Sequence, residues 1–492
     1  MKSQKIFWFI LFIFPALLSY GQSNSSASRN DKLNLTGIIP VPNKGFILFK
    51  TDSLQSPTVL DFSYFNLDND PISTVSIPTS RTDEIFALER IFIWNNKLII
   101  CSSAYQPRFR KNHLLYYEYS LPDLTLIKSE LLLKTVAPPN VYLPYLINIS
   151  PDSSKLVVGG WNYTSPKEIA KIHAIVFNKT LTVEKQHDYN FTFQNERIAF
   201  ENILVDNRSK IYIAGNNYKG ELGGITKHSK IDHFVIGLFP EEKAQFWLIK
   251  KQKQYFHQIK YALNKEQTLI GTGFWSRGYK SGIGFIEITS DKAQNIVTNQ
   301  ILFDDFKAAY KKNLPTFSAS NNKFLSYRLS HLICKEDAYF IVGENIPNET
   351  LYADILVAKL SKEGDIVWLS RIPKKQSTFN IGDKFASFSL IEQKEKFYFL
   401  FNDTNLNYKN GNNRNLNMAN ILDYTPALAE LALSSGVLKR KMLKKLLKKD
   451  YLFLPMFCQS TTKEEIIIIG TGILANVGKL YLKKVKIKAN NG

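Results

Sequence analysis

The chain has 492 residues, of which 44% are hydrophobic and 13% aromatic, and its formal net charge is +20. This composition is ample for a large buried core, and three cysteines are too few for a disulfide scaffold. The positive charge favours acidic partners such as anionic polysaccharide, lipid headgroups or nucleic acid, although a lysine-rich composition can also be a general habit of the source organism.

The first 21 residues have the pattern of a secretory signal peptide. Two lysines precede an apolar stretch from Ile6 to Leu18, and small residues occupy positions minus three and minus one of a cut before Gln22. The apolar run of 13 residues is short for a membrane span, which needs about 20. We expect an exported protein, periplasmic, cell-surface or secreted, with no transmembrane segment after signal removal; an uncleaved anchor is the alternative.

Short apolar runs that end in a small or turn-forming residue recur along the rest of the chain. Their spacing is 51 to 72 residues, and they end at these positions: Lys50, Cys101, Gly159, Gly215, Gly271, Gly343, Asn402 and Gly470. Each run follows a tight polar turn, such as "WNNK" at 94–97, and an earlier apolar strand, which together predict a hairpin. A second hairpin follows after a loop, for example at 234–250 and 355–372. The pattern predicts eight units of four strands.

Units of two antiparallel hairpins at this period are typical of a β-propeller, in which each sheet buries its faces by stacking on its neighbours. Residues 338–368, with a strand ending in glycine and a K-L-x-x-x-G-x-x-x-W ending, resemble the repeat of bacterial extracytoplasmic β-propellers, and residues 210–247 resemble it more loosely. This resemblance implies a fold and an exported location but no reaction.

We therefore expect an all-β protein with a polar segment at 22–32 and a single propeller domain at 33–492. Eight four-stranded blades are expected, and seven are the alternative if the first unit is not a full sheet. The last unit has no room for a fourth strand, so the segment from Leu33 to Val41 is expected to complete the last blade.

Two motif-like stretches do not carry the chemistry that they suggest. Gly470, Gly472 and Ala475 have the spacing of a dinucleotide-binding turn, but the residues that follow contain no acid and alternate as a strand does. "SKEGDIVW" at 361–368 resembles the Asp-box of sialidase-type propellers but departs from it at three positions, beginning with Glu363 in place of Asp. We expect no cofactor.

The cysteines and histidines indicate neither a redox site nor a metal site. Cys101, Cys334 and Cys458 each lie in or beside an apolar strand, so buried free thiols without a disulfide are expected. His228 and His233 lack metal-ligand spacing and a nearby cysteine, so no metal is expected.

The densest basic run, 436–450, permits two interpretations. As a helix it places leucines opposite lysines, as a membrane-surface segment would. In the register of the repeat, residues 428–443 instead form a second hairpin with a Ser-Ser-Gly turn at 434–436, and we favour this interpretation because it preserves the pattern of the other units.

The loops that join the second strand to the third are long and rich in aromatic and basic residues, whereas the turns of the opposite face are brief. Binding residues are commonly placed on long loops of a rigid scaffold. The candidate binding residues are therefore Tyr105, Arg108, Trp161, Tyr163, Tyr218, Trp275, Arg277 and Tyr279. Alternatively, these aromatic rings pack between loop and blade.

The resulting functional hypothesis is a noncatalytic, monomeric propeller that binds a protein or an anionic glycan through this face, with no nucleic acid expected in its compartment. The alternative is an exported carbohydrate-active hydrolase or lyase that uses acids on the same face. Asp304 with Asp305, and Glu344 with Asp354, are acidic pairs, but neither forms a known catalytic pattern. Whether the protein is an enzyme stays open, with binding favoured.

Overall fold

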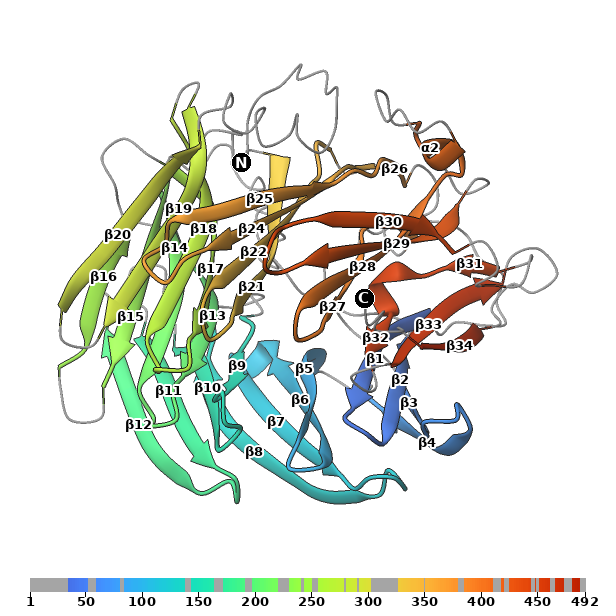
Figure 1. The fold of residues 1–492 in the computed structure, drawn as a ribbon. Coiled ribbons are helices and arrows are strands. Elements are labelled where there is room, and N and C mark those ends of the chain that lie inside the picture. Colours follow the sequence, from blue (N-terminus) through green and yellow to red (C-terminus); the bar gives the residue numbers. More distant parts are fainter. Residues whose placement is uncertain are drawn as a thin grey trace, which may run out of the picture.

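The structure is a computed structural model that describes residues 34–51, 59–79, 84–137, 143–162, 171–190, 197–219, 230–239, 243–249, 255–277, 280–289, 292–301, 326–348, 350–378, 385–409, 417–419, 424–443, 447, 451–460, 465–472 and 480–486. These residues form a ring of eight antiparallel sheets, the blades of a β-propeller (Figure 1). The predicted all-β fold with eight blades is confirmed.

Blades 1 to 4 are consecutive sheets of four strands. Their strands are β1 (Asn34–Val41), β2 (Gly45–Thr51), β3 (Val59–Phe65) and β4 (Pro71–Pro78); β5 (Ile85–Trp94), β6 (Lys97–Gln106), β7 (Lys111–Tyr119) and β8 (Leu126–Val136); β9 (Leu146–Ile149), β10 (Lys155–Asn162), β11 (Lys171–Asn178) and β12 (Val183–Asn190); and β13 (Arg197–Val205), β14 (Ile211–Lys219), β15 (Lys230–Leu238) and β16 (Gln245–Ile249).

Blades 5 to 8 continue the ring. Their strands are β17 (Tyr255–Leu263), β18 (Leu269–Arg277), β19 (Lys280–Thr289) and β20 (Lys292–Ile301); β21 (Tyr327–Cys334), β22 (Tyr339–Asn345), β24 (Ile355–Leu360) and β25 (Ile366–Ile372); β27 (Ser389–Glu392), β28 (Lys396–Asp403), β29 (Thr425–Ala432) and β30 (Leu438–Met442); and β31 (Tyr451–Phe453), β32 (Gln459–Ser460), β33 (Glu465–Gly472) and β34 (Leu480–Lys486). Shorter elements are β23 (Leu351–Tyr352) paired with β26 (Gln376–Ser377), and the helices η1 (Pro107–Phe109), α2 (Leu406–Lys409) and η4 (Pro455–Phe457).

The eight apolar runs found in the sequence are the second strands of the eight blades: β2, β6, β10, β14, β18, β22, β28 and β33. Each hairpin is set by its local turn chemistry. Asn95 and Asn96, between β5 and β6, have φ angles of 52° and 59°, which a two-residue hairpin turn requires and asparagine tolerates. The basic segment of blade 7 is the hairpin β29–β30, with Gly436 at φ 68° in its turn, as the repeat register predicts.

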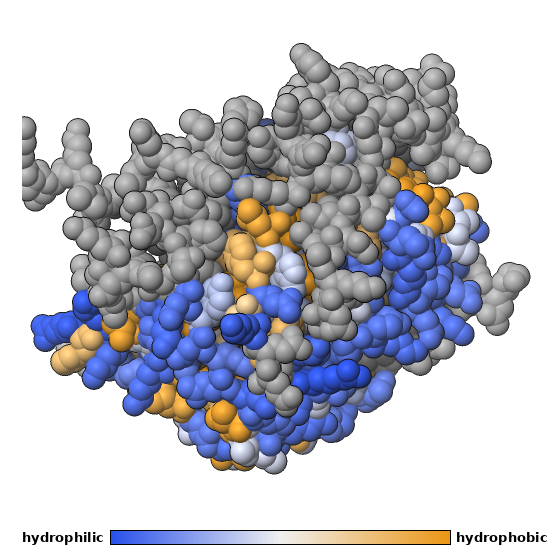
Figure 2. All heavy atoms as spheres, turned by 90° about the vertical axis from the view of Figure 1, so that its left-hand side faces the viewer, coloured by the Kyte–Doolittle hydropathy of each residue, from blue (hydrophilic) through white to orange (hydrophobic). Residues whose placement is uncertain are grey.

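The first strand of every blade lies toward the axis of the ring and the last strand lies at its outside (Figure 1). First strands of neighbouring blades contact one another, for example β9 with β13 and β17 with β21. The described outer surface seen in Figure 2 is largely hydrophilic, with small separate apolar areas. The apolar side chains lie instead between blades, in eight buried clusters of the described residues, one for each pair of neighbours.

The predicted place of the N-terminal strand is wrong. β1 pairs with β2 as the first strand of blade 1, because Pro42–Lys44 forms a tight turn in which the Lys44 N–H donates to the Val41 carbonyl at 3.0 Å. In blade 8, β31 and β32 both pair with β33 and together form one innermost strand interrupted by η4. Among the described residues, β34 is the outer strand of that blade.

Candidate functional site

Three of the aromatic candidates are core residues, which corrects the expectation that they are exposed. Tyr105 is 0% exposed, Trp161 8% and Trp275 1%. Trp161 stacks on Phe200 of blade 4 with ring centroids 3.5 Å apart. The physical reason is strand length: β6, β10 and β18 extend past the positions where the sequence indicates a loop, so these rings still lie between blades.

The other candidates have different placements. Arg108 lies in η1 and is exposed. Tyr218 belongs to β14 and Arg277 is the last residue of β18, and the structure describes the backbone of both. Tyr163 and Tyr279 lie outside the described residues. The structure therefore does not bring the eight candidates together as one surface.

An exposed aromatic and basic group does lie on the loop-rich face, at residues 107–111 between β6 and β7, which we call the blade-2 tip. Phe109 is 67% exposed, and the Lys111 ammonium lies 5.7 Å from its ring centroid. Arg108 is exposed beside it. Phe109 is not among the candidate binding residues predicted from the sequence, although the Q-P-R-F-R-K pattern at 106–111 places a lone ring among three basic residues.

The blade-2 tip is held rigidly. Arg110 adopts the left-handed conformation at φ 55°, and its N–H donates to the Pro107 carbonyl at 3.3 Å. The Arg110 Nε donates to the Ala137 carbonyl at 3.2 Å, and the Ala137 N–H donates to the Arg110 carbonyl at 3.0 Å. Exposed Ile85 and Val136 lie at the ends of the two flanking strands of the same blade. The ring of Phe109 is thus presented to solvent on a fixed backbone.

A second group of polar residues lies on the innermost strands. Among the described residues, β1, β5, β13, β17 and β21 each contain a β-bulge in their pairing with the second strand. The extra residue is polar in every case: Thr36, Glu89, Glu201, His257 and Ser330. All except Thr36 are partly exposed. Because these strands surround the axis, the bulges add polar side chains to the inner wall of the ring.

The bulges have a sequence signal that the sequence analysis missed. In each strand two adjacent polar or small residues interrupt the apolar alternation, which shifts its phase by one residue. The five stretches are L-T-G-I at 35–38, L-E-R-I at 88–91, F-E-N-I at 200–203, F-H-Q-I at 256–259 and L-S-H-L at 329–332. Aligning first strands, in addition to second strands, would have found them.

Glu201, on the innermost strand β13, has a pKa well above its ordinary value. Its partial burial raises its pKa to about 7, against the opposing effects of a hydrogen bond from Asn216 Nδ2 and the charge of Lys260 on β17. Burial lowers the pKa of Lys260, and it lowers the pKa of His257 and of His331 to about 4. The inner wall between blades 4 and 6 therefore carries a carboxyl that changes charge near neutral pH beside neutral imidazoles.

Other polar residues of the inner wall fasten one blade to the next. Arg90 of blade 2 donates to the Ile147 carbonyl of blade 3 and, at 3.1 Å, to Asn148 Oδ1. Asn148 Nδ2 donates to the Ile203 carbonyl of blade 4 at 2.9 Å. The Leu329 N–H of blade 6 donates to Gln258 Oε1 of blade 5 at 2.9 Å. These bonds give the inner wall a structural role as well.

Six charged side chains are buried together under the loop-rich face at blades 6 and 7. They form three ion pairs: Lys374 with Glu344 at 2.5 Å, Arg371 with Asp354 at 2.6 Å, and Arg440 with Asp403 at 2.9 Å. Burial raises the pKa of Asp354 to about 6 and lowers that of Arg371 to about 9. Three cations balance three anions, so the group is neutral without a ligand.

Glu344 and Asp354 are engaged in two separate ion pairs. Each is held by its own cation, Ser387 Oγ also donates to Glu344 Oε2 at 2.6 Å, and Tyr327 donates to Asp354. These bonds and ion pairs account for the burial of both charged acids without a ligand. Asp304 and Asp305 lie outside the described residues.

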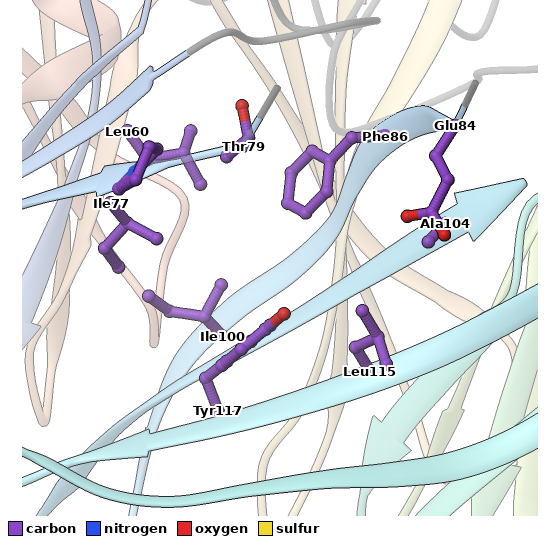
Figure 3. Close-up of a pocket in the computed structure, with 10 residues that line it drawn as sticks. Leu60, Ile77, Thr79, Glu84, Phe86, Ile100, Ala104, Leu115 and Tyr117 are labelled. Carbon is purple, nitrogen blue, oxygen red and sulfur yellow. The ribbon is translucent and has the colours of Figure 1, made fainter. Parts of the chain in front are cut away.

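A small cavity lies between blades 1 and 2 (Figure 3). Its volume is about 20 Å³, which is room for about one water molecule. Its walls are mainly apolar, and the side chains of Thr79, Glu84 and Tyr117 contribute oxygens. The Glu84 carboxylate accepts a hydrogen bond from Gln106 at 2.7 Å. The cavity is too small for an organic ligand.

The cysteines are free thiols, with Cys101 and Cys458 buried and Cys334 partly buried. Burial raises the pKa of Cys101 to about 12 and of Cys334 to about 11, which disfavours the reactive thiolate. In the part of the chain that the structure describes, no three His, Cys, Asp or Glu side chains are grouped to hold a metal ion. The helices of that same part are too short or too polar to cross a bilayer.

No protein-family model and no curated protein matches the chain in sequence. Solved structures resemble it in fold. They include the polysaccharide lyase Uly1 (11% identity, TM-score 0.41, covering 81% of this chain and 90% of that one) and the β-propeller domain of the Trilobed protease from Pyrococcus furiosus (10%, 0.38, 85% and 97%). Prolyl oligopeptidase B from Galerina marginata is similar at 10% identity and TM-score 0.41, covering 89% of this chain and 55% of that one. Similarities at this level carry no information on activity.

Proposed function

We propose that this protein is an exported, noncatalytic β-propeller that binds an anionic glycan through the blade-2 tip. The observation that carries the proposal is the rigid exposure of Phe109 between Arg108 and Lys111. A side chain that is already held in position loses little conformational entropy when a ligand binds. The few residues that dominate the binding energy of an interface commonly have this property.

The chemistry of the blade-2 tip matches an acidic sugar chain. The flat ring of Phe109 can pack against the apolar C–H face of a pyranose, and the planar guanidinium of Arg108 can hold a carboxylate or sulfate with two parallel hydrogen bonds. The excess of basic residues, with a net charge of +20, adds long-range attraction to a polyanion. The signal-like N-terminus supports a location where such polymers occur.

The test is a titration of the exported protein with a soluble acidic polysaccharide, polygalacturonate, and with neutral dextran, by isothermal calorimetry. We expect binding to polygalacturonate that weakens with salt, and no binding to dextran. Phe109→Ala and Arg108→Ala should each weaken binding about tenfold, which is about 1.4 kcal/mol. Neither should change the melting temperature, because both side chains are exposed.

Val437→Ala is the matched control, because Val437 is an exposed apolar residue in a turn of the opposite face. Unchanged affinity in both tip variants would exclude the blade-2 tip as the anchor. Release of shortened or unsaturated sugar products from polygalacturonate would instead support the hydrolase or lyase alternative. Binding to neither polymer, with specific binding of a purified protein partner that needs Phe109, would favour the protein-binding alternative.

A further inference from the structure

The outer strands of the blades expose a sheet edge, and several of the described ones carry residues that discourage pairing with another strand. β4 has proline at both ends, β12 is rich in charged residues, and β30 contributes three basic residues in five positions. Prolines and charges on an edge are known devices against edge-to-edge association. In Figure 2 the described residues on the side shown are likewise largely hydrophilic.

β8, the outer strand of blade 2, is different. It is 11 residues long, and four of its large apolar side chains are exposed: Leu126, Ile127, Leu131 and Val136. Ile127 is 50% exposed and Leu131 43%. Within the described residues β8 pairs only with β7, so the backbone groups of its outer edge have no strand beside them. Exposed apolar residues on an open edge favour the addition of a further strand.

The residues of β8 are complementary to a second copy of themselves. The stretch from Leu126 to Leu132 reads L-I-K-S-E-L-L. If two copies pair antiparallel about Ser129, Lys128 of each faces Glu130 of the other, and Ile127 faces Leu131. Opposite charges and apolar residues that face each other across antiparallel strands stabilise the pair. A two-fold axis requires such self-complementarity.

We propose that two copies of this protein associate through their β8 strands, in antiparallel register centred on Ser129. The occupant of the open edge is thus a second copy of this chain. Lys128 and Glu130 already form an ion pair at 2.8 Å within one copy, and their side chains are 36% and 40% exposed, so both charges remain accessible to a second copy. The apolar side chains of Ile127 and Leu131 would be buried between the two copies.

The geometry of β8 limits the length of the new ladder. Its register with β7 is regular from Lys128 to Leu131 and shifts on either side, at Ile127 and Leu132. Bulges twist an edge away from a flat partner. The pairing is therefore short, and we expect a dimer that dissociates at micromolar concentration, not an obligate one.

The first test is disulfide trapping at the symmetry axis. Residues that face each other in antiparallel strands have Cα atoms about 4.5–5.5 Å apart, which is within the range that a disulfide spans. Ser129→Cys should therefore give a covalent dimer on mild oxidation of the exported protein. Val183→Cys, at an exposed apolar position on the outer strand of blade 3, and the unchanged protein are the controls and should stay monomeric.

The second test is charge reversal, read by sedimentation velocity over a range of concentrations. Lys128→Glu or Glu130→Lys places like charges opposite each other and should raise the dimer dissociation constant at least tenfold. The double variant Lys128→Glu/Glu130→Lys restores opposite charges across the axis and should restore dimerisation. Unfolding should not differ among the variants, since exposed ion pairs contribute little to stability.

Either of two results would overturn the proposal. One is an unchanged protein that stays monomeric at every concentration tested, together with no trapping at Ser129. The other is a dimer that the single charge reversals leave intact, because a different surface would then hold the two copies. Neither result bears on the blade-2 tip, whose variants retain β8.

Discussion

At the scale of single residues, the neighbours of a side chain decide its role more than its chemical type does. Trp275 and Phe109 are both aromatic residues near the loop-rich face, yet one is 1% exposed and the other 67%. Trp275 packs in the cluster between blades 4 and 5 with Tyr261 and Phe256, and its indole Nε1 has no hydrogen-bond partner in the described part of the chain. Its contribution is to packing.

Trp275→Ala should therefore lower the free energy of unfolding by about 3–5 kcal/mol, because it leaves a cavity between two blades. Trp275→Phe should cost much less, since it retains most of the packed ring and removes a buried N–H without an acceptor. Urea unfolding measures both. If Trp275→Ala weakened glycan binding and left stability unchanged, the ring would belong to a binding surface after all.

At the scale of elements, each bulge inserts one extra polar residue into an innermost strand. Glu201 is such an extra residue in β13, and its pKa of about 7 exceeds the ordinary value of 4.5. Between these two values the folded protein retains a proton that the unfolded chain releases. Because the unfolded chain releases this proton more readily, a rise in pH favours the unfolded state. The free energy of unfolding therefore falls as the pH rises from about 4.5 to 7.

Glu201→Gln should remove this pH dependence, because an amide does not ionise. At pH 8 we expect the variant to be more stable than the unchanged protein by about 1–3 kcal/mol, and at pH 4 the two should be similar. Urea unfolding at both pH values measures the difference. Asp337→Asn, at an exposed acid, is the control and should show no such gain. An equal effect of Glu201→Gln at pH 4 and pH 8 would contradict the assignment.

At the scale of the whole molecule, side-chain packing closes the ring between its first and last blades. Phe46 and Leu48 of β2 pack against Ile467 and Ile469 of β33 in one buried cluster. The ion pair across this junction, Lys484 with Asp68, is long at 3.8 Å, and Asp68 is 82% exposed. The apolar contacts therefore dominate the closure.

Ile469→Ala should lower the free energy of unfolding by about 2–5 kcal/mol, because Ile469 is 0% exposed and its truncation leaves a cavity at the junction. Lys484→Ala should cost less than about 1 kcal/mol. Chemical denaturation compares the two variants. A larger loss from Lys484→Ala than from Ile469→Ala would show that charge, not packing, closes the ring.

The sequence by itself determined the strands, their pairing into hairpins and the number of blades. These features depend on local signals: apolar alternation, turn residues such as Asn95 and Asn96, and a repeat that places one buried second strand in each unit. The same repeat register correctly identified the lysine-rich segment at 425–442 as a hairpin, because a strand pair there continues the pattern of its neighbours.

Only the tertiary structure decided which aromatic rings are buried and how the buried charges pair. Tyr105, Trp161 and Trp275 each lie near the end of a strand, where a side chain is covered or exposed according to the neighbouring blade and not to its own sequence. Asp403 and Arg440 are 37 positions apart and meet only because β28 and β30 belong to one sheet. Contacts between distant segments follow from how strands and blades pack against one another, and a local pattern carries no record of that packing.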